Sequence, residues 1–239
     1  MQTRQHSGRA SKGSQFHLQN LVNDLQNLVN GYPEYLNCLI LSSSPSLRTY
    51  AATHPKWVSP LASDNYMEYR DERFLEAIGF PQLSDQLYAF WPLRGPVWDA
   101  LATVEGKNGS EGVVIVEAKS HIPEISGQGC KAESPESRAK IGRSLATVKQ
   151  VLGVKPEADW MGEFYQYANR LAHLYFLNVI AQISAWMVFL YFVGDVEQNG
   201  PSTVIDWLTD LDGIRNKLGL PQHHLLDQRV VSVFAPVRG

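Results

Sequence analysis

The segment that most constrains the fold is Gly112-Val-Val-Ile-Val-Glu-Ala-Lys-Ser-His121, in which four β-branched residues precede an acid and a lysine. The β-branched run at 113–116, preceded by Gly109 and Gly112, predicts a buried strand. Side chains alternate between the two faces of a strand, so Glu117 and Lys119 emerge on the same face. Charged groups at the end of an apolar strand are costly unless they are paired or liganded. We therefore expect a functional site at this end of the strand.

A second strand-like run lies upstream, at about 97–104, and it begins next to Asp99. The intervening Lys107-Asn108-Gly109 is a strong hairpin-turn signal, which predicts that the two strands are antiparallel neighbours. Such a hairpin would bring Asp99 beside Glu117.

The remaining apolar patterns predict helices and strands in alternation. Helices are expected at about 18–29, 66–78, 137–152, 163–183 and 203–218, a short strand at 87–91, and further strands at 185–193 and 229–237. Residues 42–65 are rich in Ser and Pro and indicate a loop. This order fits an α/β fold with a single mixed β-sheet flanked by helices.

The composition is that of an ordinary soluble α/β protein, with 44% hydrophobic and 19% charged residues. The 239 residues suffice for one large domain, which we place at 15–239 after a disordered tail at 1–14. The net charge of -3 does not by itself indicate nucleic-acid binding. The segment 131–155 is locally basic, however, with six Lys and Arg against Glu133 and Glu136.

Compartment and membrane association follow from two further features. Cys38 and Cys130 match no metal-ligand spacing and indicate a reducing compartment, and the N-terminus has no apolar signal-peptide core, so we expect a cytoplasmic protein. Residues 171–194 contain no Asp, Glu, Lys or Arg and could span a bilayer. Their polar residues, His173, Asn178 and Gln182 among them, favour a buried core instead, so we expect no membrane.

Two carboxylates on a hairpin are natural ligands for a hard divalent cation such as Mg²⁺. A metal held by Asp99 and Glu117 could lower the pKa of a bound water and offset charge on a leaving group. Lys119 could stabilise charge on a phosphate, or orient or deprotonate the attacking water. The alternative is an ordinary Glu/Lys pair at the exposed end of a hairpin, with an Asp in a turn.

At Trp98-Asp99 and Val116-Glu117-Ala118-Lys119 the sequence resembles the PD-(D/E)XK nuclease superfamily, which has the restriction-endonuclease-like fold. The resemblance covers roughly residues 66–193, and Trp98 stands where the family pattern has proline. It implies that Asp99 and Glu117 bind the metal, Mg²⁺ with Mn²⁺ as a substitute, and that Lys119 assists catalysis. The family often adds a glutamate from the preceding helix. Of the row Glu68, Glu72 and Glu76 we choose Glu76, because it lies nearest the following strand.

Several other polar residues have both a functional and a structural interpretation. The helix at 163–183 carries a polar stripe of Gln166, Asn169, Arg170 and His173, which is either buried polar packing or a wall of the site. The basic helix at 137–152 either contacts phosphates or has a solvated face. His121 is either a phosphate contact or a strand-end surface residue, and His223-His224 with Asp227 is either a zinc site or a solvated loop. The residues that we assign to nucleic-acid binding are Arg138, Lys140, Arg143, Gln166 and Arg170; the stripe also includes Asn169 and His173.

We therefore expect a metal-dependent nuclease that hydrolyses phosphodiester bonds, with DNA as the expected substrate; the choice between DNA and RNA and a homodimer stay open. One alternative is a catalytically inactive nucleic-acid-binding protein of the same fold. Another is an enzyme that uses an acidic metal site on a small molecule.

Overall fold

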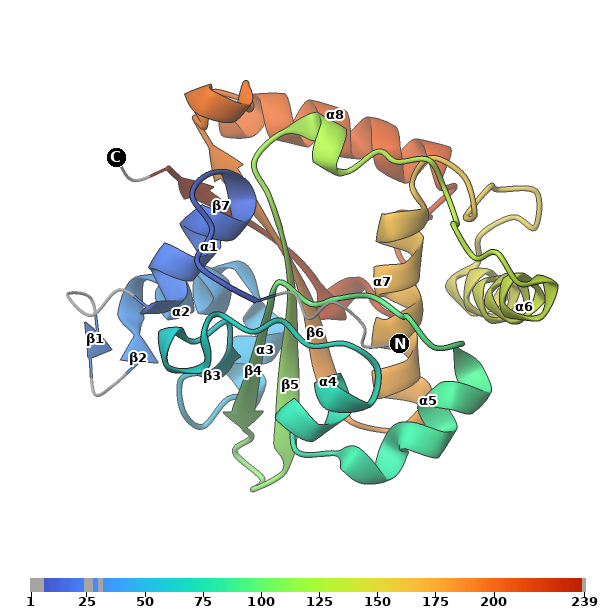
Figure 1. Cartoon of the computed structure of the whole chain (residues 1–239), viewed down its shortest axis with the longest axis horizontal. Coiled ribbons are helices and arrows are strands. Elements are labelled where there is room, and N and C mark those ends of the chain that lie inside the picture. The colour runs from blue at the N-terminus through green and yellow to red at the C-terminus, as the bar shows by residue number, and fades with distance from the viewer. Residues whose placement is uncertain (1–6, 24–27, 30–31, 238–239) are drawn as a thin grey trace.

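The computed structural model describes residues 7–23, 28–29 and 32–237. Its centre is a five-stranded mixed sheet with the strand order β3-β4-β5-β6-β7 (Figure 1). The strands are β3 (Lys56–Ser59), β4 (Ala100–Glu105), β5 (Glu111–Lys119), β6 (Ser184–Val193) and β7 (Val230–Pro236). The expected α/β fold with a single mixed sheet flanked by helices is thereby confirmed.

Eight α-helices are described around the sheet. They are α1 (Gly13–Asn23), α2 (Glu34–Ser43), α3 (Pro45–Tyr50), α4 (Asp71–Ala77), α5 (Ser84–Phe90), α6 (Pro135–Leu152), α7 (Tyr165–Tyr175) and α8 (Val204–Lys217). A π-helical turn, Phe176–Ile180, continues α7. A two-residue ribbon, β1 (Leu28–Val29) paired with β2 (Tyr32–Pro33), lies apart from the main sheet.

The sheet changes direction in its middle. β4 is antiparallel to β3 and β5, whereas β6 is parallel to β5 and to β7. The parallel connections are long and carry α6, α7 and α8, as parallel pairing requires. β6 lies between two parallel neighbours and is buried along almost all its length, which explains its continuous apolar sequence.

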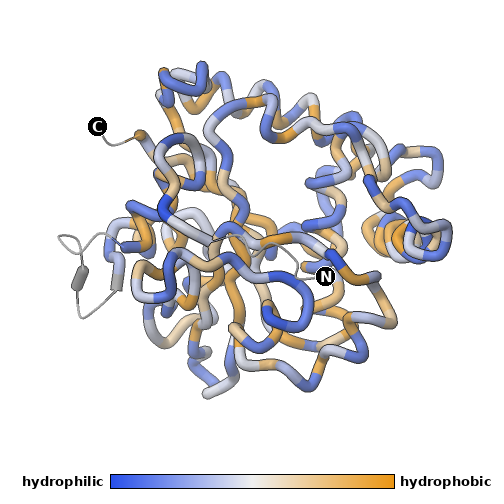
Figure 2. Tube along the Cα trace, viewed as in Figure 1, coloured by the Kyte–Doolittle hydropathy of each residue, from blue (hydrophilic) through white to orange (hydrophobic). Residues whose placement is uncertain are grey.

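Alternation along β5 and β6 divides the hydrophobic core into two layers. Val113, Ile115 and Met187 face α4 to α8, whereas Val114 and Val188 face α1, α2 and α3 on the other side. Figure 1 shows these two groups of helices on opposite sides of the sheet, and Figure 2 shows hydrophobic residues concentrated along the central strands. Among the described residues, no helix is long and apolar enough to cross a membrane.

The second half of the chain follows the sequence patterns closely. The antiparallel hairpin of β4 and β5, the helices α6 and α7 and the strands β6 and β7 all lie where they are expected. The helix α8 begins with the predicted capping box, in which Thr203 and Asp206 each accept a hydrogen bond from the other's backbone N–H.

The first half departs from the expectations in four segments. Leu28 and Val29 are in β1 rather than a helix, and residues 24–27 and 30–31 of that expected element lie outside the described residues. The expected loop at 42–65 contains α3 and β3, and the expected strand at 87–91 is largely the helix α5. The helix expected at 66–78 begins only at Asp71. Short apolar runs are ambiguous between helix and strand, and here tertiary contacts decide.

The expectation of a disordered tail at 1–14 is also wrong for residues 7–14, which are the part of it that the structure describes. The backbone N–H of Gly8 donates to the carbonyl of Asn65, and Gly8 in turn accepts from the side chain of Gln19. Gly13 and Ser14 already belong to α1. These contacts fix the segment against the rest of the domain.

Candidate active site

The register of the hairpin places two acidic residues side by side. Ala100 pairs with Val116, so the preceding residue, Asp99, lies next to Glu117. Both side chains, together with that of Lys119, line one cavity of about 400 Å³. The three residues that carry the family resemblance are therefore brought together, at the carboxyl end of β5, where ligands commonly bind in parallel α/β sheets.

Glu117 is buried, at 2% exposure, and is held between two cations. The Nζ of Lys119 lies 2.6 Å from its Oε1, and the Nε of Arg170 lies 2.7 Å from its Oε2. Burial raises the pKa of Glu117, but the charges of Arg170 and Lys119 outweigh it and hold that pKa below its ordinary value. Glu117 is thus an anion in the folded protein at neutral pH.

Arg170 is a buried residue of α7 with several partners. Its guanidinium also donates to the side chain of Asn169 and to the carbonyl of Val97, and it lies 5.0 Å from the centre of the Trp98 ring. The cost of burying an arginine on an apolar helix is thereby offset by its ion pair with Glu117.

Asp99 has a different environment. Its Oδ2 accepts a hydrogen bond of 2.8 Å from the backbone N–H of Ala118, which fixes the carboxylate against the neighbouring strand. Burial and the adjacent charge of Glu117 raise the pKa of Asp99 to about 7, although Lys119 and the Ala118 N–H oppose the shift.

Two further carboxylates line the cavity, those of Glu68 and Glu124, whereas the expected Glu76 does not. Glu68 lies in the extended segment before α4, and the bridge between Tyr69 and Trp98 holds that segment beside Asp99. Its Oε1 accepts a 2.6 Å hydrogen bond from Gln15. Burial and the charges of Asp99 and Glu117 raise the pKa of Glu68 to about 8.

The structure separates the glutamate row that the sequence suggested. The helix starts after Glu68, so the spacing of four does not place the row on one face. Glu76 is exposed on α4 and is not among the residues that line the cavity.

The polar stripe on α7 divides into two parts. Gln166 and Arg170 line the cavity and form a wall of the site. His173 is buried, packs against the rings of Trp91 and Trp98, and lies 2.8 Å from the carbonyl of Asn169. Burial lowers the pKa of His173 to about 3, so it is a neutral core residue.

The basic residues of α6 do not reach this cavity. Lys140 donates to the carbonyl of Tyr88 and Arg138 to that of Cys130, while Arg143 is exposed. None of the three lines the cavity. Their contact with nucleic acid stays a prediction.

The histidines considered earlier also lie elsewhere. His121 is outside the cavity lining, 3.9 Å from Glu124. His223 and His224 lie 3.2 and 3.3 Å from Asp227, near the beginning of β7. In the described part of the chain, no group of three or more His, Cys, Asp or Glu side chains is arranged to hold a metal ion.

Sequence reasoning missed the contribution of α1 to the site. Ser14 lines the cavity and donates to Glu124, while Gln15 binds Glu68. Neither residue carries a local signal, because α1 approaches the cavity only through the tertiary fold.

Comparison of the chain with protein-family models, with curated proteins and with solved structures gives no match. The function must therefore be inferred from the geometry of the site.

Proposed function

We propose that this protein is a metal-dependent nuclease that hydrolyses phosphodiester bonds, with DNA as its substrate. The observation that supports the proposal is the convergence of Asp99, Glu117, Lys119 and Glu68 on one cavity. A lysine among several carboxylates can act in phosphodiester hydrolysis. A purely structural ion pair would need only one carboxylate beside the lysine.

One or two of the carboxylates of Asp99, Glu68 and Glu117 would suffice for Mg²⁺, which usually takes one or two protein carboxylates and keeps several waters. This preference for few protein ligands fits a cavity in which protein groups do not supply a complete set of metal ligands. Burial raises the pKa values of Asp99 and Glu68, and repulsion from neighbouring carboxylates raises them further; a cation in the cavity would relieve that repulsion. When bound, the metal would lower the pKa of a water and offset charge on the leaving oxygen.

The protein's own groups then have distinct tasks. Lys119, held by Glu117, presents a fixed positive charge toward a phosphate in the cavity, where developing charge is stabilised most. Arg170 keeps Glu117 ionised and in place. The amide of Gln166 can donate to a phosphate oxygen or accept from the attacking water.

One observation favours a second function, that of an inactive nucleic-acid-binding protein. Both oxygens of Glu117 already accept hydrogen bonds from cations. A carboxylate has about four acceptor positions, so metal binding stays feasible, but the ion pairs alone could also complete the site.

The test is cleavage of supercoiled plasmid and of single-stranded DNA in the presence of Mg²⁺, Mn²⁺ or EDTA. We expect metal-dependent cleavage that falls by at least about 10²-fold in Asp99→Asn, Glu117→Gln and Lys119→Ala. Asp210→Asn and Lys56→Ala alter exposed residues outside the cavity and serve as controls.

Three results would contradict the proposal. DNA binding that weakens with salt, without cleavage under any metal, would favour the inactive alternative. Cleavage that survives in all three cavity variants would place the activity elsewhere. Failure to bind either DNA or RNA would favour an enzyme acting on a small molecule.

A further inference from the structure

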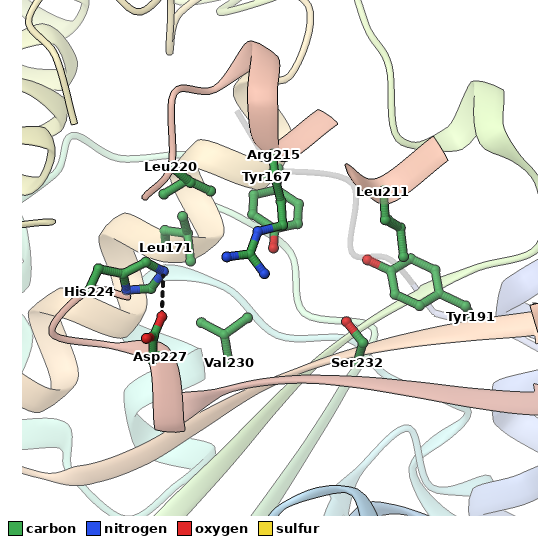
Figure 3. Close-up of a pocket in the computed structure, with 10 residues that line it drawn as sticks. All are labelled: Tyr167, Leu171, Tyr191, Leu211, Arg215, Leu220, His224, Asp227, Val230 and Ser232. Atoms are coloured by element: carbon green, nitrogen blue, oxygen red, sulfur yellow. Dashed lines mark ion pairs between the residues drawn. The ribbon is translucent and has the colours of Figure 1, made fainter. Parts of the chain in front are cut away.

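A second pocket, of about 90 Å³, lies between α7, α8 and the beginning of β7 (Figure 3). One buried water needs about 10–15 Å³ on the same measure, so the pocket has room for a small ligand rather than for a single solvent molecule. Leu171, Leu211, Leu220 and Val230 supply apolar walls. The other six lining residues carry polar groups: Tyr167, Tyr191, Arg215, His224, Asp227 and Ser232.

The pocket contains a guanidinium and a carboxylate that do not pair with each other. Arg215 reaches in from α8 and Asp227 from the chain before β7 (Figure 3). Among the described residues, Asp227 forms ion pairs within 4.0 Å with His223 and His224, and none joins it to Arg215. Arg215 donates a long hydrogen bond, of 3.4 Å, to the carbonyl of Pro221.

This pair of groups restricts the class of ligand. A simple anion would bind Arg215 but would be repelled by Asp227. A simple cation would bind Asp227 but would be repelled by Arg215. A ligand with an acceptor edge and a donor edge satisfies both. Guanine has such edges: O6 and N7 accept from an arginine fork, and its N1–H and N2–H₂ can donate to a carboxylate.

The walls suit a flat ring as well. The aliphatic side chains can cover the faces of a base, while the hydroxyls of Tyr167, Tyr191 and Ser232 line the same space. The ring of Tyr167 is held by stacking on Phe189, with centroids 4.3 Å apart and planes 5° apart. The pocket is therefore partly preformed.

The pocket is close to the candidate active site. Tyr167 and Tyr191 also line a narrow recess that contains Glu117, Lys119 and Arg170. These two tyrosines thus lie between the second pocket and the recess that contains Glu117.

We propose that this pocket binds a guanine base, through Arg215 and Asp227. The base can belong to a free guanine nucleoside or to an unstacked position of a single strand. The strand source rests on the proposed nuclease function, because it would give the enzyme a base preference next to its cavity. The free nucleoside does not depend on that function.

The test is titration calorimetry in EDTA, so that cleavage plays no part. The probes are guanosine, adenosine, oligothymidylate and the same oligonucleotide with one dG. We expect saturable binding of guanosine, of the dG oligonucleotide, or of both. Guanosine should bind more tightly than adenosine, or the dG oligonucleotide more tightly than oligothymidylate. The probe that binds shows whether the base comes from a free nucleoside or from a single strand.

Arg215→Lys keeps the charge but removes the fork, and Asp227→Asn keeps the shape but removes the second acceptor oxygen. Each should weaken binding by at least tenfold, with the thermal transition unchanged. Lys217→Ala, which removes the neighbouring exposed cation of α8 paired with Glu163, should leave binding intact. The proposal is overturned if neither guanine probe binds, if adenosine binds equally, or if the two pocket variants bind like the wild type. A failed nuclease assay with guanosine binding retained would reject the proposed function and leave this pocket standing.

Discussion

Glu117 is the residue on which the candidate site depends most. It is buried, ionised and held by Lys119 and Arg170 from two different elements. Removing one partner of a buried ion pair leaves an uncompensated charge, which costs far more than the pair itself contributes.

We therefore predict that Arg170→Ala lowers the free energy of unfolding by about 3–5 kcal/mol. The loss should appear as a lower midpoint in urea unfolding followed by tryptophan fluorescence. Arg143→Ala, an exposed arginine of α6, is the matched control and should change the stability by less than about 0.5 kcal/mol. A stability of Arg170→Ala equal to that of the control would show that Glu117 is not buried as an anion.

The pKa of Glu68 gives a prediction with a definite sign. Its ordinary value is 4.5 and its value in the folded protein is about 8, so between these pH values the folded state retains a proton that the unfolded chain has released. The free energy of unfolding therefore falls as the pH rises through this window. Glu68→Gln removes this dependence, so the variant should gain stability over the wild type up to pH 8 and match it at pH 4.5.

The matched control is Glu76→Gln, on the exposed face of α4, whose stability should follow the wild type at every pH. The same pair of variants tests the proposed metal binding without an activity assay. Mg²⁺ at pH 8 should raise the melting temperature of the wild type and of Glu76→Gln, but less that of Glu68→Gln. If Glu76→Gln is the variant that loses the response, the choice made from the sequence is the correct one.

At the scale of single residues, the sequence was sufficient for Asp99, Glu117 and Lys119, because strand alternation and a hairpin turn determine their positions. It was insufficient for Glu68. A spacing of four residues suggested a helical row, but α4 starts after Glu68, and the boundary of a helix is poorly determined by periodicity.

At the scale of elements, α1 contributes a wall of the cavity although it lies far from the motifs in sequence. Gln15 holds Glu68, Ser14 contacts Glu124, and His17 lies 3.0 Å from Asp195 after β6. The helix is thus attached to three separate segments around the site.

We predict that Gln15→Ala weakens the site through Glu68. Loss of a partner for a buried polar group costs about 1–3 kcal/mol, and the unsupported carboxylate should bind Mg²⁺ less tightly. The measurement is the stability in EDTA together with the Mg²⁺ concentration that gives half of the thermal shift. Gln150→Ala on the exposed face of α6 is the control. An unchanged Mg²⁺ response in Gln15→Ala would limit α1 to a packing role.

The elements differ in how well their sequences identify them. α6 and α8 have clear caps, at Ser134 and Thr203, and β6 is a continuous apolar run, so each could be predicted. The segments α2, α3 and β3 are short. The helices α2 and α3 pack on the far face of the sheet, where α2 contacts β7, and β3 is the edge strand that pairs with β4. Such contacts leave no local pattern.

At the scale of the whole molecule, β5 and β6 are shared by both layers of the core. Val114 faces α1 to α3, while its neighbour Ile115 faces α4 to α8. A loss of packing on either side should therefore reach the other through the same strands.

We predict that Val114→Ala and Ile115→Ala each lower the midpoint of a single cooperative unfolding transition. Neither variant should unfold one layer of the core alone. The cost of Ile115→Ala should be about 2–5 kcal/mol. Urea unfolding should be followed by circular dichroism and by tryptophan fluorescence, whose curves should coincide for both variants. Separate midpoints in either variant would mean that the layers are independent folding units.

The involvement of α1 in the cavity has a consequence for protein synthesis. The groups around the cavity come from both ends of a long stretch of chain, from Ser14 to Arg170, and β5 needs its neighbour β6 for support. A nascent chain halted after Lys119 would already carry Glu68, Asp99, Glu117 and the lysine, but neither Glu124 nor the arginine that holds Glu117. The cavity can therefore form only after most of the polypeptide has left the ribosome, which would keep any hydrolytic activity from appearing on unfinished chains.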